Sequence, residues 1–113
     1  MSINSMLKNA LKSIAPVQAG DYEPPEDKPD ETYITFNHNS YPDDFADDEP
    51  GHEVYSVQVH LFCKSGLNSL AMRKKIKSGL KKAGFTYPKA IDVSDRDGQH
   101  HVFECMITTE IEE

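Results

Sequence analysis

The sequence predicts an α+β domain: a mostly antiparallel, four-stranded sheet with two helices packed on one face. Two segments have the apolar spacing of amphipathic helices, two have the alternation of half-buried strands, and turn residues separate them. A chain of 113 residues has the usual size of one domain. We expect residues 1–15 to form the first helix, residues 16–31 an acidic, proline-rich connector, and residues 32–113 the sheet and the second helix.

The first helix is predicted by apolar residues that recur every three or four positions: Ile3, Met6, Leu7, Ala10, Leu11 and Ile14. Ser2 can cap its N-terminus, and Pro16 should stop it, because proline clashes with the preceding helical turn. The following residues, up to 31, are rich in proline and acids. Such a composition buries too little apolar area to order itself, so it predicts an extended or mobile connector.

Two strands are predicted next, at residues 32–37 and 54–63. The second alternates clearly, with one face formed by Tyr55, Val57, Val59, Leu61 and Cys63. Between the strands, the acidic residues 38–53 predict a long loop. Loops longer than about 12 residues are uncommon in compact domains unless they are functional or disordered. We therefore expect this loop to have a function.

The second helix is predicted within residues 66–84 by one apolar stripe, formed by Met72, Ile76, Gly79, Leu80 and Ala83. Gly84 is a natural terminator of this helix. Residues 85–113 predict a hairpin with its turn at 95–98. Pro88 predicts that its first strand is an edge strand or a bulged strand, since proline cannot donate a hydrogen bond to a neighbour. In the last strand, alternate residues from Phe103 to Ile111 should face the core.

The net charge of −7 is distributed unevenly, and it argues against non-specific nucleic-acid binding by the whole molecule. Acids gather in the predicted loop at Asp43, Asp44, Asp47, Asp48, Glu49 and Glu53. Residues 73–82 contain no acid, and their cations include Arg73, Lys74, Lys77 and Lys81. Because opposite charges orient an encounter, we expect these ten residues to form a contact between copies. Repeated head to tail, such a contact closes a ring.

The same residues give little support to catalysis or to a cofactor. The acidic loop offers oxygen ligands, but its spacing departs from that of calcium loops. His100 and His101 should point to opposite faces of a strand. Cys63 and Cys105 could meet on paired strands, yet they lack the spacing of zinc sites, and two buried thiols are the expectation. No nucleophile elbow or glycine-rich phosphate loop is present, so we expect no enzyme, no metal and no cofactor.

No run of about 18 apolar residues occurs, so no membrane span is expected. The N-terminal residues lack a continuous apolar segment, so no secretory signal is expected either. With only two cysteines, a reducing cytoplasm is the expected compartment.

Four short elements in order resemble the small tail-completion, or tail-terminator, proteins of long-tailed bacteriophages and prophages. They are YITF at residues 33–36, ADDE at 46–49, a strand of the form Y-x-V-Q-V-x-[LIV]-[FW] at 55–62, and KAGF at 82–85. The resemblance covers about residues 16–111. The long acidic connector departs from the family's pattern, and so does His60, which occupies a strand position that is more often hydrophobic or acidic.

This resemblance implies a non-enzymatic structural protein of the virion. Proteins of that family cap the head-proximal end of the tail tube, usually as a six-membered ring, which ends tube polymerisation and forms the surface that joins the head. The implied partners are further copies of the chain, the tail tube protein and a head-completion or connector protein. The implied location is the host cytoplasm during assembly and then the head-tail junction of the virion.

Three alternatives to a tail-terminator protein remain open. A head-completion protein or another minor tail adaptor would have a similar architecture. An acidic regulatory protein would use its carboxylates to mimic the phosphates of DNA and occupy a basic partner. Salt-dependent binding to a DNA-binding enzyme, without a ring, would favour the mimic. A metal-dependent hydrolase would need a stoichiometric Mg²⁺ or Ca²⁺ site.

Overall fold

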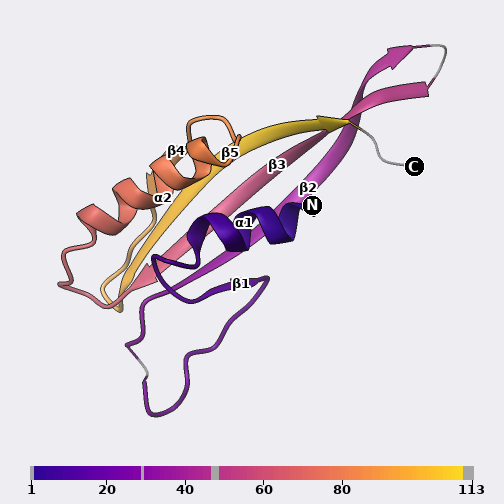
Figure 1. The fold of residues 1–113 in the computed structure, drawn as a ribbon. Helices are drawn as coiled ribbons and strands as arrows, with labels where there is room; N and C mark the ends of the chain where they lie inside the picture. The colour runs from indigo at the N-terminus through magenta and orange to yellow at the C-terminus, as the bar shows by residue number, and fades with distance from the viewer. Residues whose placement is uncertain (1, 29, 47–48, 111–113) are drawn as a thin grey trace.

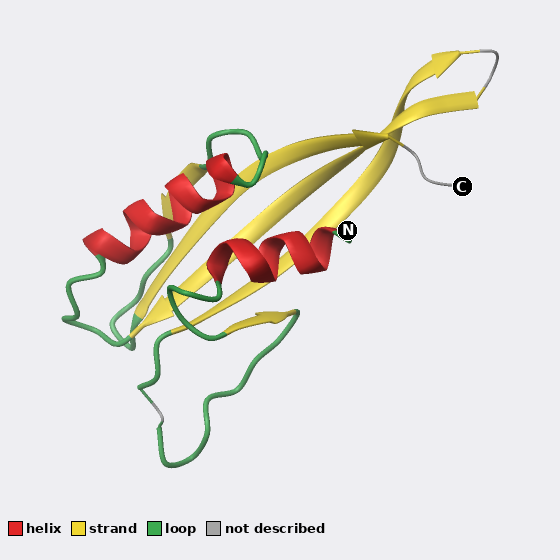
Figure 2. Cartoon of the chain, viewed as in Figure 1, coloured by secondary structure: helices red, strands yellow, loops and turns green. Residues whose placement is uncertain are grey.

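The computed structural model describes residues 2–28, 30–46 and 49–110, with the side chains of these residues except 43–51 and 110. The described residues form two helices and a five-stranded sheet, in the order α1 (Ile3–Leu11), β1 (Val17–Ala19), β2 (Tyr33–Ala46), β3 (Glu49–Cys63), α2 (Leu70–Lys82), β4 (Lys89–Asp92) and β5 (Gln99–Glu110). Both helices lie on one face of the sheet (Figure 1 and Figure 2). The α+β class is therefore confirmed.

The strand order is β1-β2-β3-β5-β4, and the predicted count of four strands is wrong. The fifth strand, β1, lies within the predicted connector and pairs in parallel with β2, Val17 opposite Ile34. The amide of Ile34 donates to the carbonyl of Pro16 at 2.8 Å, and the amide of Gly20 donates to the carbonyl of Phe36 at 2.9 Å. Three residues are too few to show an alternating pattern, so β1 has no sequence signature.

The prediction of a long acidic loop at residues 38–53 is also wrong. β2 and β3 form a long antiparallel hairpin whose register runs from Tyr33 opposite Phe62 to Ala46 opposite Glu49. Among the described residues, β5 accompanies β3 as far as the pair of Glu110 and His52. The hairpin thus extends beyond the rest of the sheet (Figure 1). A backbone ladder needs no apolar side chains, which explains why the polar composition did not reveal these strands.

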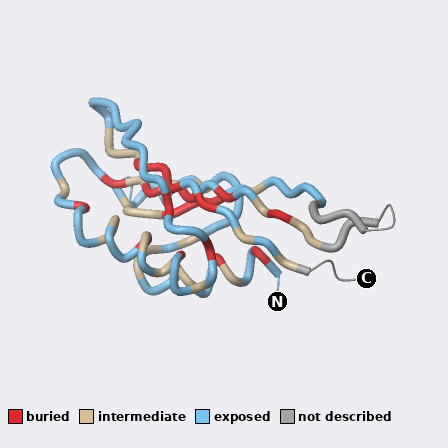
Figure 3. Tube along the Cα trace, turned by 90° about the horizontal axis from the view of Figure 1, so that it is seen from above, coloured by how far each residue is buried: buried red, intermediate tan, exposed pale blue. Residues whose placement is uncertain are grey.

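The core lies between the helices and the sheet, and the buried positions in Figure 3 follow this layer. From the sheet it contains Ile34, Phe36, Val57, Val59, Leu61, Cys63, Phe103 and Cys105, and from the helices Ile3, Leu7, Leu11, Ile76 and Leu80. The predicted inner faces of β3 and α2, and that of β5 as far as Ile107, are therefore confirmed, whereas Ile111 lies outside the described residues. Leu67 packs against this core, whereas Leu70 is 48% exposed.

The helix ends follow local chemistry. Ser2 caps α1, because its Oγ accepts a hydrogen bond from the amide of Ser5 at 3.1 Å. α1 ends at Leu11, earlier than the Pro16 stop that we predicted. After α2, Gly84 has a φ of +106°, a left-handed conformation that glycine adopts without strain. The predicted terminator is therefore confirmed, and β4 is an edge strand directly after Pro88, as predicted.

Candidate functional site

The described members of the predicted acidic interface belong to the far part of the β2–β3 hairpin. Asp43 and Asp44 are residues of β2, and Glu49 is the first residue of β3. Glu53, also in β3, is opposite Pro42 of β2 and is partly exposed. Asp47 and Asp48 lie outside the described residues. The four described acids thus belong to strands and not to the loop that we predicted.

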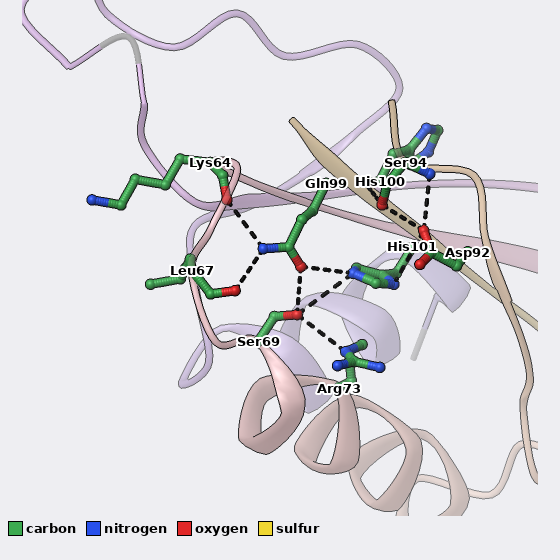
Figure 4. Close-up of polar contacts among 9 residues, drawn as sticks. All are labelled: Lys64, Leu67, Ser69, Arg73, Asp92, Ser94, Gln99, His100 and His101. Atoms are coloured by element: carbon green, nitrogen blue, oxygen red, sulfur yellow. Dashed lines mark hydrogen bonds and ion pairs between the residues drawn. The ribbon is translucent and has the colours of Figure 1, made fainter. Parts of the chain in front are cut away.

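The predicted cations all lie on α2, but their environments differ. Lys74 and Lys81 are exposed and Lys77 is partly exposed. Arg73 instead turns toward the sheet, where its Nε donates to Ser69 Oγ at 3.1 Å (Figure 4). Hydrogen bonds from Ser94 lower the pKa of the nearby Asp92 carboxyl, and the charges of His101 and Arg73 lower it further. The Arg73 side chain therefore already has a hydrogen-bond partner within its own chain.

The acidic and basic segments are not brought together within one chain. The molecule is elongated, with a longest dimension of 54 Å. The hairpin end lies at one extreme of this axis, and α2 lies over the other half of the sheet (Figure 1 and Figure 3). The described parts of the two segments therefore lie in different parts of the molecule.

A polar network fixes the N-terminus of α2 on the sheet (Figure 4). Gln99, the first residue of β5, donates from Nε2 to the carbonyls of Leu67 at 2.6 Å and Lys64 at 3.1 Å. Its Oε1 accepts from the hydroxyl of Ser69 at 2.7 Å and from His101 Nε2 at 3.0 Å. The bonds to Leu67, Ser69 and His101 are partly buried, so the loss of one of them would leave a polar atom poorly solvated.

Ser69, His101 and Asp92 resemble a nucleophilic triad in composition but not in geometry. The Ser69 Oγ lies 3.5 Å from His101 Nε2, and His101 Nδ1 lies 3.9 Å from Asp92 Oδ1. A general base must lie about 2.6–3.2 Å from the atom whose proton it takes, and it must have a free lone pair. Here Nε2 donates its hydrogen to Gln99, and Ser69 is only 1% exposed. Ser69 and His101 instead share Gln99 as a hydrogen-bond partner, which joins the start of α2 to β5.

The sheet face without helices has a row of aromatic rings at the end remote from the hairpin tip. The ring centroids of Tyr22 and Tyr33 are 4.9 Å apart, those of Tyr33 and Phe62 4.7 Å, and those of Phe62 and His100 4.3 Å. His60 Nδ1 lies 2.8 Å from His100 Nε2. Burial lowers the pKa of both histidines, and the charge of His100 lowers that of His60 further.

The two cysteines are free and buried, as expected, but they do not meet. In the β3–β5 register Cys63 is opposite Gln99, whereas Cys105 is opposite Val57, six residues away along β3. Burial raises the pKa of the Cys105 thiol to about 11, and it also raises that of Cys63. His100 and His101 do point to opposite faces, as predicted.

The described residues contain no group of three or more histidine, cysteine or acidic side chains placed to hold a metal ion. In the same part of the chain, no helix has the length and apolar character needed to cross a membrane.

Sequence reasoning missed the Ser69 network and the aromatic row. One signal for the row was available: Tyr33 and Phe62 are apolar residues on the strand faces opposite the core positions. No sequence signal for the Ser69 network was available, because it joins polar residues that are far apart in the chain. The chain matches no model of a known protein family, and a search of curated proteins found no match either.

Proposed function

We propose that this chain is a structural protein of a bacteriophage virion that caps the head-proximal end of the tail tube. In this role it assembles with copies of itself into a ring, usually six-membered in the proteins that it resembles. The ring ends tube polymerisation and forms the surface that meets a head-completion or connector protein. Assembly takes place in the host cytoplasm, and the finished ring lies at the head-tail junction.

One observation is the main support for this proposal: complementary charges lie at separate ends of one elongated chain. The acidic hairpin extends beyond the helices, and the exposed lysines of α2 lie over the other half of the sheet. A contact between two such different surfaces is heterologous, and repetition closes a ring when the rotation permits. The exposed charges are screened beyond about 8 Å at physiological salt, so the ring should be weak until a tube end adds contacts.

Charge reversal tests the contact between copies. Lys74→Glu, Lys77→Glu and Lys81→Glu together should abolish ring formation, measured by sedimentation and by electron microscopy of the ring on tube ends. A matched control reverses the exposed Lys8, Lys12 and Lys28, which changes the net charge equally and should leave rings intact. A hairpin variant with Asp43→Lys and Asp44→Lys should restore association when it is mixed with the α2 variant. Unchanged rings in the α2 variant would overturn the proposed contact.

The role itself needs a second experiment, with the tail tube protein encoded beside this chain. Tubes grown with this protein should have a limited length, and tubes grown without it should be long and unable to join heads. Equal tube lengths in both cases would refute the capping function. If the protein instead bound a DNA-binding enzyme in a salt-dependent manner and formed no ring, the DNA-mimic alternative would replace it.

A further inference from the structure

A groove of about 370 Å³ lies beside the aromatic row, at the end of the sheet remote from the hairpin tip. Its floor includes the rings of Tyr33, Phe62 and His100, which come from three neighbouring strands. The rings stack on one another, with centroids 4.7 and 4.3 Å apart, so each ring is held by its neighbours. The groove therefore has a preorganised apolar floor.

The rim of this groove is acidic. Asp30 and Glu31 line it from the segment before β2, and Asp95 and Asp97 line it from the turn before β5. Lys64 is the one lysine or arginine among the described lining residues. Burial lowers the pKa of His100, so its imidazole is neutral at pH 7 and does not offset the carboxylates. Opposite walls of the groove thus present negative charge above an apolar floor.

We propose that this groove binds an extended, basic segment of a partner protein. Lysine and arginine side chains combine a long apolar stem with a charged head, so the stem can lie along the ring edges while the head reaches the rim carboxylates. Phosphate groups would be repelled by the same rim, which disfavours a nucleic acid as the occupant.

In the part of the chain that the structure describes, no residue of the hairpin end and no exposed lysine of α2 lines the groove. A chain in a ring would therefore keep this site free for a second kind of partner. The proposal goes beyond the capping function, because it concerns a different surface and can be tested on the free protein.

The test is a titration of the full chain with a short synthetic peptide of alternating arginine and glycine, followed by NMR. Amide shifts should concentrate at residues 30–33, 62–64 and 93–100. Asp30→Asn with Asp97→Asn should weaken binding about threefold to tenfold, since two charge pairs are lost. Asp95 is kept, because its Oδ1 accepts the amides of Asp97 and Gly98 and shapes the turn.

The matched control is Asp21→Asn with Asp27→Asn, which removes the same charge from exposed residues that do not line the groove. The control should bind the peptide as the unmodified chain does. Equal weakening in both variants, shifts centred on the hairpin, or tighter binding of oligothymidylate than of the peptide would overturn the proposal. Loss of rings in the earlier experiment would leave this result unaffected.

Discussion

The Nδ1 atom of His60 lies 2.8 Å from the Nε2 atom of His100, so one of the two nitrogens donates a hydrogen bond and the other accepts it. The accepting ring must be neutral. Phe62 stacks on His100 on the same face, with ring centroids 4.3 Å apart. The pair is therefore compatible with one proton between the facing atoms and incompatible with two.

Acidification should destabilise the fold through this pair. Burial lowers the pKa of His60, His100 and His101 in the folded chain, although Asp95 opposes the shift at His100 and Asp92 opposes it at His101. Unfolded imidazoles titrate near pH 6.5. Below that pH the unfolded chain binds more protons than the folded chain, so the free energy of unfolding falls. Well above that pH these histidines are neutral in both states, so they do not make the free energy of unfolding depend on pH.

The measurement is the urea midpoint at about pH 7.5 and about pH 5.5. The doubly substituted chain, His60→Gln with His100→Gln, should lose less stability between the two values, with the remainder due to His101. Parallel losses in both proteins would show that the pair does not contribute.

Truncation of Leu80 should cost about 2–5 kcal/mol of unfolding free energy, because Leu80→Ala leaves a cavity in the core between α2 and the sheet. Leu80 is fully buried, whereas Leu70, in the same helix, is 48% exposed. Leu70→Ala should therefore change stability by no more than about 0.5 kcal/mol. Chemical denaturation followed by circular dichroism gives the unfolding free energy of each variant. Similar losses in Leu80→Ala and Leu70→Ala would contradict the assigned inner face of α2.

Removal of the Ser69 hydroxyl should destabilise the protein by about 1–3 kcal/mol, since the hydroxyl links Arg73 to Gln99 in a buried network. Ser78→Ala is the control, because Ser78 is an exposed residue of the same helix whose hydroxyl donates to backbone carbonyls. In thermal unfolding, Ser69→Ala should have a clearly lower melting temperature than Ser78→Ala. If Ser69→Ala were as stable as the control, the network would have no role in fixing α2.

The thiols should be nearly inert in the folded protein. Cys63 and Cys105 are 5% and 4% exposed, and burial raises the pKa of both, so few thiolates exist at pH 8. Labelling with a chromogenic disulfide should be slow without denaturant and fast in urea, with two thiols per chain in the unfolded state. Rapid labelling without urea would mean that the sheet face beneath the helices opens readily.

The sequence was informative wherever apolar periodicity ran for several residues. It placed the inner faces of β3, β5 and α2 correctly, down to Ile76 and Leu80. It failed where backbone hydrogen bonds alone define the structure. β1 has three residues, and the hairpin near Asp43 is rich in polar residues and lacks a regular apolar alternation, so its strand geometry comes from the ladder with β3. Long-range polar contacts such as Ser69 with Gln99 depend on sheet register, which no local pattern specifies.

The candidate site was predictable in part. The segregation of acids and lysines could be read directly from the chain, and the structure places the two groups in different elements. The internal position of Arg73 was missed, although its hydrogen bond to Ser69 joins residues four positions apart, which is one turn of a helix. The aromatic floor beside His100 likewise needed the alignment of three strands.

Beyond the pair of His52 and Glu110, β2 and β3 have only each other as strand neighbours among the described residues. A ribbon of two strands is marginally stable, so its local opening needs less free energy than that of the middle of the sheet. Amide hydrogens at Phe45 and Ala46 should exchange with deuterium well before those at Val57 and Val59. Any molecule that rests on this ribbon would slow the exchange, and mass spectrometry could then report docking in samples too heterogeneous for imaging.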